Sequence, residues 1–191
     1  MFRSIGHNLA RLTDFSGRES RGLYWPYAIS VFVLAMLAGL LLMVPVMTDM
    51  MQRMVAYMQA HPEGLPKPAP GQPPVFPPEL MPDIGRMIVP LAIVNLVSLL
   101  FYAAATVRRL HDRDRTGWWA ALPLPFQLLG VLIGRRAMEA LMHPGAASSP
   151  LATLSSLNSL LYWAAFIYLI VLLAGEATKG PNRFGEPPAL S

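Results

Sequence analysis

The stretch YWPYAISVFVLAMLAGLLLMVPVM, residues 24–47, contains no charged side chain. A membrane hydrocarbon core about 30 Å thick is crossed by roughly 20 consecutive apolar residues of α-helix. A second uncharged stretch, MIVPLAIVNLVSLLFYAAATV, covers residues 87–107, and its Pro90 falls in the opening turn, where a missing N–H costs little. Both stretches predict transmembrane helices.

Two further stretches complete the predicted bundle. Residues 118–134 are short for a span and contain Pro123 and Pro125, so they form either a kinked span or a re-entrant segment; we favour the span. Residues 157–174 are apolar and carry a band of aromatic side chains. The predicted fold is an all-α membrane protein with four transmembrane helices.

The composition agrees with a membrane location. Of the 191 residues, 54% are hydrophobic and only 14% are charged, and the mean hydropathy is +0.42. A soluble domain carries about 25% charged residues, so this chain could not cover a water-facing surface. The lack of cysteine excludes disulfides, thiolate metal sites and cysteine nucleophiles.

The basic residues predict the orientation. Ten of the fifteen lie in residues 1–23, 108–117 or 175–191, and five lie in the other two connections, 48–86 and 135–156. Short loops rich in Lys and Arg stay in the cytoplasm. We therefore expect both termini to be cytoplasmic, with the first span as an uncleaved anchor.

The amino-terminal segment has two local patterns. Four apolar residues at helical spacing share one narrow face: Phe2, Ile5, Leu9 and Leu12. They predict an amphipathic helix in the cytoplasmic interface, with a frayed tail as the alternative. Ser16 and Glu19 fit a capping box, which predicts that a helix begins at Gly17 and continues into the first span.

The connection at 48–86 is rich in proline, with nine prolines between Pro62 and Pro82. So dense a run favours extended polyproline II, which we interpret as a stiff periplasmic spacer of low complexity rather than a ligand for aromatic grooves. Residues 50–60, before the prolines, could prolong the first helix outward.

The second span carries one polar stripe, formed by Asn95, Ser98, Tyr102 and Thr106. The stripe indicates hydrogen bonds between helices or, alternatively, the wall of a hydrophilic path. No Asp, Glu, Lys, Arg or His lies inside any of the four predicted spans, whereas pumps and proton-coupled carriers normally keep one there. A small permease or channel subunit using this stripe remains the alternative function.

Catalytic signatures are missing from the chain. The four histidines make no H-E-x-x-H spacing, and there is no G-x-S-x-G motif and no P-loop. We expect no catalytic residues, no metal site, no cofactor and no nucleic-acid partner. His111 beside Asp112 leaves a minor alternative, an enzyme that acts on a lipid headgroup.

The densest polar feature is the connection Arg108–Gly117, which holds four arginines and two aspartates and precedes Trp118 and Trp119. Arginine can hold a phosphate through two hydrogen bonds, and tryptophan belongs at headgroup depth. This pattern suits an anionic lipid headgroup. The alternative is that the arginines only set the topology while the tryptophans anchor the helix end.

Three motifs resemble the DUF805 family of small bacterial inner membrane proteins. Residues 15–25 resemble its opening F-x-G-R-x-x-R-x-x-[YF]-W, and residues 108–119 resemble its central R-R-L-H-D-x-x-x-[ST]-G-W-W. Residues 180–187 resemble the first eight positions of its closing G-x-N-R-[FY]-G-x-[DP]-P. The long proline-rich connection departs from that pattern. The resemblance implies a four-helix inner membrane protein of undefined biochemical activity.

All three motifs fall on the side that the charge count assigns to the cytoplasm, so we expect their side chains to converge there. The candidate ligand-binding residues are Arg18, Arg21, Arg108, Arg109, His111, Asp112, Trp118, Trp119, Asn182 and Arg183. They form either an ion-paired latch between the tail and the loop, with Gly180 and Gly185 allowing the tail to fold back, or a binding site. The ligand would be an anionic headgroup or a partner protein.

The function we expect is therefore a non-enzymatic scaffold or anionic-lipid-interacting module with a cytoplasmic working surface. Its expected partners are membrane lipids. Protein partners would be either a second copy of the chain, in a homo-oligomer, or another membrane protein.

Overall fold

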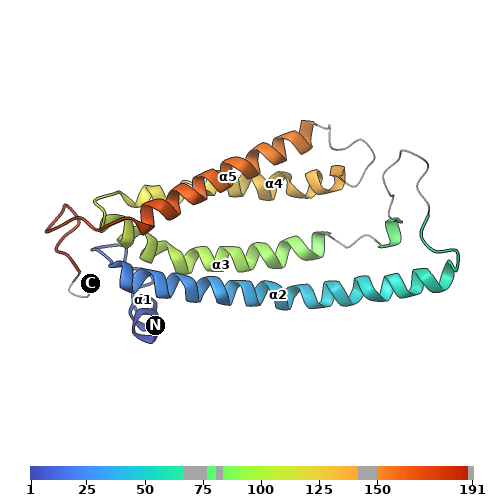
Figure 1. The fold of residues 1–191 in the computed structure, drawn as a ribbon, viewed down its shortest axis with the longest axis horizontal. Coiled ribbons are helices and arrows are strands. Elements are labelled where there is room, and N and C mark those ends of the chain that lie inside the picture. The colour runs from blue at the N-terminus through green and yellow to red at the C-terminus, as the bar shows by residue number, and fades with distance from the viewer. Residues whose placement is uncertain (67–76, 81–83, 142–149, 189–191) are drawn as a thin grey trace. The chain divides into compact units, whose positions relative to one another are not determined.

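A computed structural model describes residues 1–66, 77–80, 84–141 and 150–188, and in these ranges the chain is helical apart from loops and one isolated bridge between Asn182 and Gly185. The elements, in order, are α1 (Phe2–Leu9), α2 (Arg21–Ala60), the 3-10 turn η1 (Pro78–Leu80), α3 (Ile84–His111), the 3-10 turn η2 (Gly117–Ala121), α4 (Leu124–Leu141) and α5 (Pro150–Ala174) (Figure 1). Among the described residues, four helices are long and apolar enough to cross a membrane. The predicted all-helical membrane fold is confirmed.

The chain divides into two compact units, which are described separately. Unit 1 contains Met1–Ala35 and Leu96–Ser191, and unit 2 contains Met36–Asn95. All residues of the three sequence motifs belong to unit 1.

Helix α2 has 40 residues, which at a rise of 1.5 Å per residue makes it about 60 Å long, twice the thickness of a hydrocarbon core. The predicted extension through residues 50–60 is confirmed. Most of the proline-rich run, residues 67–76 and 81–83, lies outside the described residues, so the extended conformation expected there stays a prediction.

The predicted helix start at Gly17 is wrong, because α2 begins at Arg21. Ser16 does not cap a helix; its amide donates to the Asp14 carboxylate at 3.0 Å and its hydroxyl donates to the same group. These bonds, together with those from Arg11, lower the pKa of Asp14. Glu19 cannot complete a capping box because its side chain is buried against Arg108, so a tertiary ion pair overrides the local pattern.

The third predicted span is built from η2 and α4, with the break at Leu122 and Pro123. Helix α4 runs without interruption from Leu124 to Leu141 beside α5 (Figure 1), whereas a re-entrant segment would turn back. It passes the predicted end at Gly134, and α5 begins seven residues before the predicted start at Leu157, so the expected loop 135–156 is largely helical. The amide of Asn158 in α5 donates to the Phe126 carbonyl of α4 at 3.0 Å.

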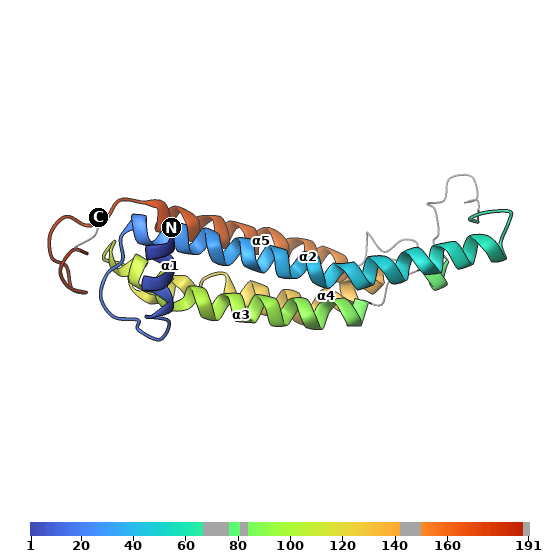
Figure 2. The same ribbon diagram turned by 90° about the horizontal axis from the view of Figure 1, so that it is seen from below.

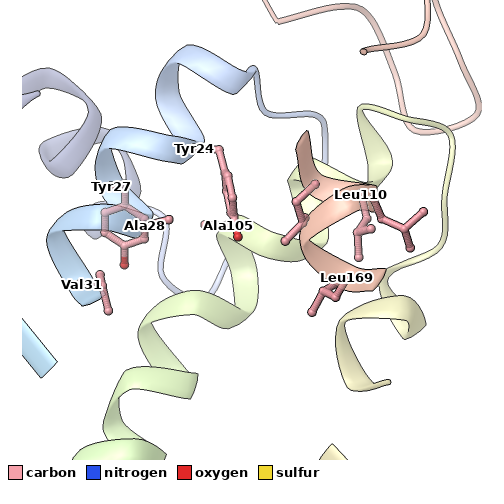
Figure 3. Close-up of a cluster of buried hydrophobic side chains, with 9 residues drawn as sticks. Tyr24, Tyr27, Ala28, Val31, Ala105, Leu110 and Leu169 are labelled. Atoms are coloured by element: carbon pink, nitrogen blue, oxygen red, sulfur yellow. The ribbon is translucent and has the colours of Figure 1, made fainter. Parts of the chain in front are cut away.

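The core of unit 1 lies where α2, α3 and α5 meet (Figure 3). Its buried side chains are Tyr24, Tyr27, Ala28, Val31, Ala105, Leu110, Leu169, Leu172 and Leu173. Tyrosines hydrogen-bond across the α2–α3 contact: the Tyr27 hydroxyl donates to the Phe101 carbonyl and the Tyr102 hydroxyl to the Ala28 carbonyl, both at 2.9 Å. Such bonds hold helices together inside a membrane.

The predicted amphipathic helix forms as α1 and ends at Leu9, so Leu12 lies outside it. It lies beside the end of α2 in Figure 1 and runs across the ends of α2 and α3 in Figure 2. Its polar edge is the buried one, because Ser4 and Asn8 are nearly inaccessible while Phe2 is 90% exposed. The Ser4 hydroxyl donates to the Leu23 carbonyl.

Candidate functional site

Three arginines and two carboxylates are buried together at the end of unit 1 near α1. We call this set the arginine network: Arg18, Glu19, Arg108, Arg109 and Asp112. Arg108, Arg109 and Glu19 are 0% exposed. Charged side chains are almost never fully buried unless they are paired, so each member needs a partner inside the protein.

Asp112 joins two of the arginines. One carboxylate oxygen accepts from Arg18 Nε at 3.0 Å, and the other accepts from Arg109 Nη1 at 2.5 Å. Arg109 lies in α3, three residues before Asp112, which directly follows that helix, whereas Arg18 comes from the segment before α2. The carboxylate therefore connects the first motif to the central one.

Arg108 secures the amino-terminal segment. Its Nε donates to Glu19 at 2.8 Å, and its Nη2 donates to the side-chain carbonyl of Asn8 in α1 at 2.6 Å. Its Nη1 donates to the main-chain carbonyls of Arg11, at 2.9 Å, and Asp14. Every nitrogen of this guanidinium thus has a protein acceptor.

Arg18 secures the carboxyl-terminal tail. Its Nη2 donates to the Thr178 carbonyl at 2.8 Å and its Nη1 to the Gly180 carbonyl at 2.7 Å. Thr178 bonds in the opposite direction as well, because its amide donates to the Asp112 carbonyl at 2.9 Å. The tail is therefore held by both side-chain and main-chain bonds.

Three arginines also cap the end of α5. The last four carbonyls of a helix have no partner within it, and here each accepts from a guanidinium. Arg113 bonds to Val171 and Leu172, Arg109 bonds to Leu173 at 2.9 Å, and Arg21 bonds to Ala174 at 3.3 Å. The arginine network has three arginines but only two carboxylates, so it carries one excess positive charge. A helix carboxyl terminus carries partial negative charge, which helps to offset that excess.

The tail turns back over the end of α3. The Asn182 side-chain amide donates to the His111 carbonyl at 2.9 Å, and the Phe184 ring stacks on the His111 ring with centroids 3.8 Å apart. Gly180 and Gly185 have φ of 73° and 120°, a region that glycine adopts without strain. These are the two glycines for which the sequence predicted a fold-back.

An open pocket of about 540 Å³ adjoins the network on its solvent side. It is lined by Arg113, Asp114, Arg115, Thr116, Trp119, Thr178 and Arg183. Arg183 donates to Asp114 at 3.0 Å, in an ion pair about half exposed. Arg115 is exposed, and its guanidinium has no hydrogen-bond or ion-pair partner among the described residues.

The sequence pattern of the DUF805 family, described as proteins of unknown function, matches residues 12–186. The chain belongs to the DUF805 family. Comparisons with curated proteins and with solved structures found no similar protein. In this DUF805 protein the three motifs are brought together by the contacts that bury the arginine network, although Asn8 of α1 precedes the matched region.

The predicted site residues separate into two groups in this DUF805 protein. The residues that converge in or on the network are Arg18, Arg108, Arg109, His111, Asp112 and Asn182. Arg21 and Arg183 lie at its exposed rim, and Trp118 is 84% exposed. Trp119 packs against the core.

Sequence reasoning missed some contributors. Glu19 was assigned to a helix cap, and Asn8, Arg113 and Thr178 were not singled out. Glu19 had one usable signal, since it is an acidic residue inside an arginine-rich motif and the buried arginines need counter-charges. In the described part of the chain, no group of three or more histidine or acidic side chains is placed to hold a metal ion.

Proposed function

We propose that this DUF805 protein is a non-enzymatic scaffold of the bacterial inner membrane that binds anionic lipid headgroups in the pocket beside the arginine network. The observation that carries the proposal is the difference between the two sets of arginines. Arg18, Arg108 and Arg109 donate their hydrogen bonds to acceptors inside the protein, whereas the Arg115 guanidinium lines an open pocket and has no partner among the described residues.

The network acts in this proposal as the latch, and the pocket acts as the site. A phosphate cannot reach Arg108 or Arg109 without breaking their internal bonds, because both side chains are inaccessible. The pocket instead offers Arg115, the edge of Arg183 and the Thr116 hydroxyl. The Thr178 hydroxyl also lines the pocket, but it already donates to the Asp112 carbonyl at 3.1 Å. A charged guanidinium with a neighbouring hydroxyl donor suits a phosphate.

The location follows from the tryptophans and the basic residues. Trp118 is exposed at the start of the third span, where an indole ring is expected at headgroup depth. The ten-to-five division of basic residues supports a cytoplasmic location for this end, facing a leaflet rich in anionic lipid.

The alternative functions receive less support from the contacts. Tyr102 and Thr106, half of the polar stripe proposed for a permease path, make hydrogen bonds to α2. Asp112 is occupied by two arginines, and His111 Nδ1 is bonded to the Gly17 carbonyl at 3.2 Å, so the two side chains do not form an acid–base pair with each other. We therefore favour a scaffold over a transporter or an enzyme.

Replacing Arg115 with glutamine tests the site. In phosphatidylglycerol nanodiscs the wild type is expected to unfold at a higher temperature than in phosphatidylcholine, because a ligand that binds the folded state stabilises it. Arg115→Gln should lose most of this difference between the two lipids, since one basic residue near an anionic surface contributes about 1 kcal/mol. In phosphatidylcholine the variant should unfold like the wild type.

Lys179→Gln is the matched control. Lys179 is an exposed basic residue at the same end of unit 1, but it does not line the pocket. A wild type with no preference for anionic lipid would contradict the proposal. So would an equal loss in both variants, which would indicate general surface attraction without a site.

A further inference from the structure

The second half of α2 gathers soft metal ligands on one face. These residues are Met47, Met50, Met51, Met54, Met58 and His61. An α-helix turns 100° per residue, which places all six within an arc of about 100°. His61 directly follows the helix and continues its geometry, because its amide donates to the Tyr57 carbonyl at 2.9 Å.

This face belongs to unit 2 and, apart from Met47, lies beyond the apolar stretch of residues 24–47. Polar residues begin at Thr48, so the methionines that follow are not needed to contact lipid tails. Met51 and Met58 are 66% and 55% exposed. Asp49 and Arg53 form an ion pair at 2.9 Å. Both residues lie about 110° or more from the centre of the methionine face, which therefore carries no net charge.

His61 is held in a form that can bind a metal. Its Nδ1 lies 3.1 Å from the Tyr57 carbonyl oxygen, and a carbonyl only accepts, so the proton is on Nδ1 and the Nε2 lone pair is available. The ring also stacks on Tyr57, with centroids 4.2 Å apart. Metal-binding histidines characteristically donate their other ring N–H to a carbonyl or carboxylate in this way.

We propose that Met54, Met58 and His61 form a binding site for a soft monovalent cation, Cu(I) or Ag(I). The three residues follow one another at spacings of four and three, which aligns them along one side of the helix. Thioether sulfur selects Cu(I), and imidazole is also a good copper ligand. This site is independent of the proposed lipid function.

The lack of charge on the ligands sets the choice of ion. Two thioethers and a neutral imidazole bring no negative charge, so they suit a monovalent ion. Calcium and magnesium prefer oxygen ligands, usually carboxylates, and structural zinc sites use thiolate, imidazole or carboxylate rather than thioether. Met51, one turn before Met54 on the same face, is placed to supply a third sulfur.

Silver titration of the full-length protein in detergent tests the proposal, because Ag(I) has the coordination preferences of Cu(I) and does not oxidise in air. We expect saturable binding of Ag(I) detected by calorimetry in chloride-free buffer, with Ag–S contacts in X-ray absorption. Met54→Leu, Met58→Leu and His61→Gln should each weaken binding by about tenfold or more.

Met43→Leu is the matched control, because Met43 lies on the same face of α2 but inside the apolar span. Methionine-to-leucine changes conserve volume and leave the fold intact, which circular dichroism would verify for each variant. Binding that is lost in Met54→Leu and Met58→Leu and kept in Met43→Leu supports the site.

Three results would overturn the proposal. The first is a wild type that does not bind Ag(I). The second is unchanged affinity in a Met54→Leu/Met58→Leu double variant, which would show that the methionines only provide an apolar face for another helix or protein. The third is Zn(II) affinity equal to that for Ag(I), which would indicate a histidine site without thioether selectivity.

Discussion

Replacing Asp112 with asparagine is expected to lower the free energy of unfolding by about 3–5 kcal/mol, because an uncompensated buried charge carries a cost of that size. Asp112 is the shared acceptor of Arg18 and Arg109, and its side chain is 1% exposed. Asparagine keeps the shape and removes the charge, so both guanidinium groups would lose their anionic partner. Reversible denaturant unfolding in detergent measures the change.

Asp114→Asn is the control. Asp114 lies only two residues after Asp112 and also pairs with an arginine, Arg183, but its side chain is 47% exposed. An exposed ion pair contributes about 0–1 kcal/mol, so this variant should unfold almost like the wild type. Equal effects of the two substitutions would mean that burial of Asp112 does not matter to stability, and the latch would have to be abandoned.

Arg108→Gln should have an effect of similar size, and it separates a latch from a phosphate site. In the latch, removal of the guanidinium leaves Glu19 buried without a counter-charge and frees Asn8 and the Asp14 carbonyl. We expect a loss of about 3–5 kcal/mol. If Arg108 instead served an external phosphate, its removal from a cluster of like charges would not destabilise the fold.

A double-mutant cycle with Glu19→Gln identifies the cause. The double variant Glu19→Gln/Arg108→Gln should be more stable than the sum of the single losses predicts, since it leaves no unpaired charge. Additive losses would contradict a direct Arg108–Glu19 interaction. Unfolding of Arg108→Gln at the wild-type midpoint would contradict the latch itself.

The membrane fold could be predicted because a span has one dominant requirement. Residues 24–47 and 87–107 are apolar without interruption, and in a bilayer such stretches have few alternatives to a helix. Helix ends were harder to predict. Arg135 and Arg136 mark the end of an apolar stretch, but the residues after them favour helix, so α4 continues to Leu141.

The residues of the arginine network could be found in the sequence, but not their partners. Family-like motifs drew attention to Arg18, Arg108 and Asp112, and all three are central in the structure. Most of the remaining acceptors are main-chain carbonyls, such as those of Leu173 and Gly175, which carry no sequence signal. The distinction between buried Arg108 and exposed Arg115 likewise depends on tertiary packing, because both belong to the same short basic segment.

Glu19 shows why local rules failed at this site. Its spacing from Ser16 fits a capping box, which contributes about 1 kcal/mol to a helix. The buried pair with Arg108 is worth more, because leaving that arginine unpaired costs several kcal/mol. The chain therefore gives up the cap, and α2 begins four residues later than the capping pattern predicts.

Hydrogen–deuterium exchange of the tail tests the central claim, that the network fastens the tail to the end of the bundle. The Thr178 amide donates to the Asp112 carbonyl at 2.9 Å, and the neighbouring carbonyls of Thr178 and Gly180 accept from Arg18. The account predicts slow exchange at Thr178 in the wild type, faster exchange in Asp112→Asn and no change in Asp114→Asn. Exchange at the rate of an unstructured peptide in the wild type would contradict it.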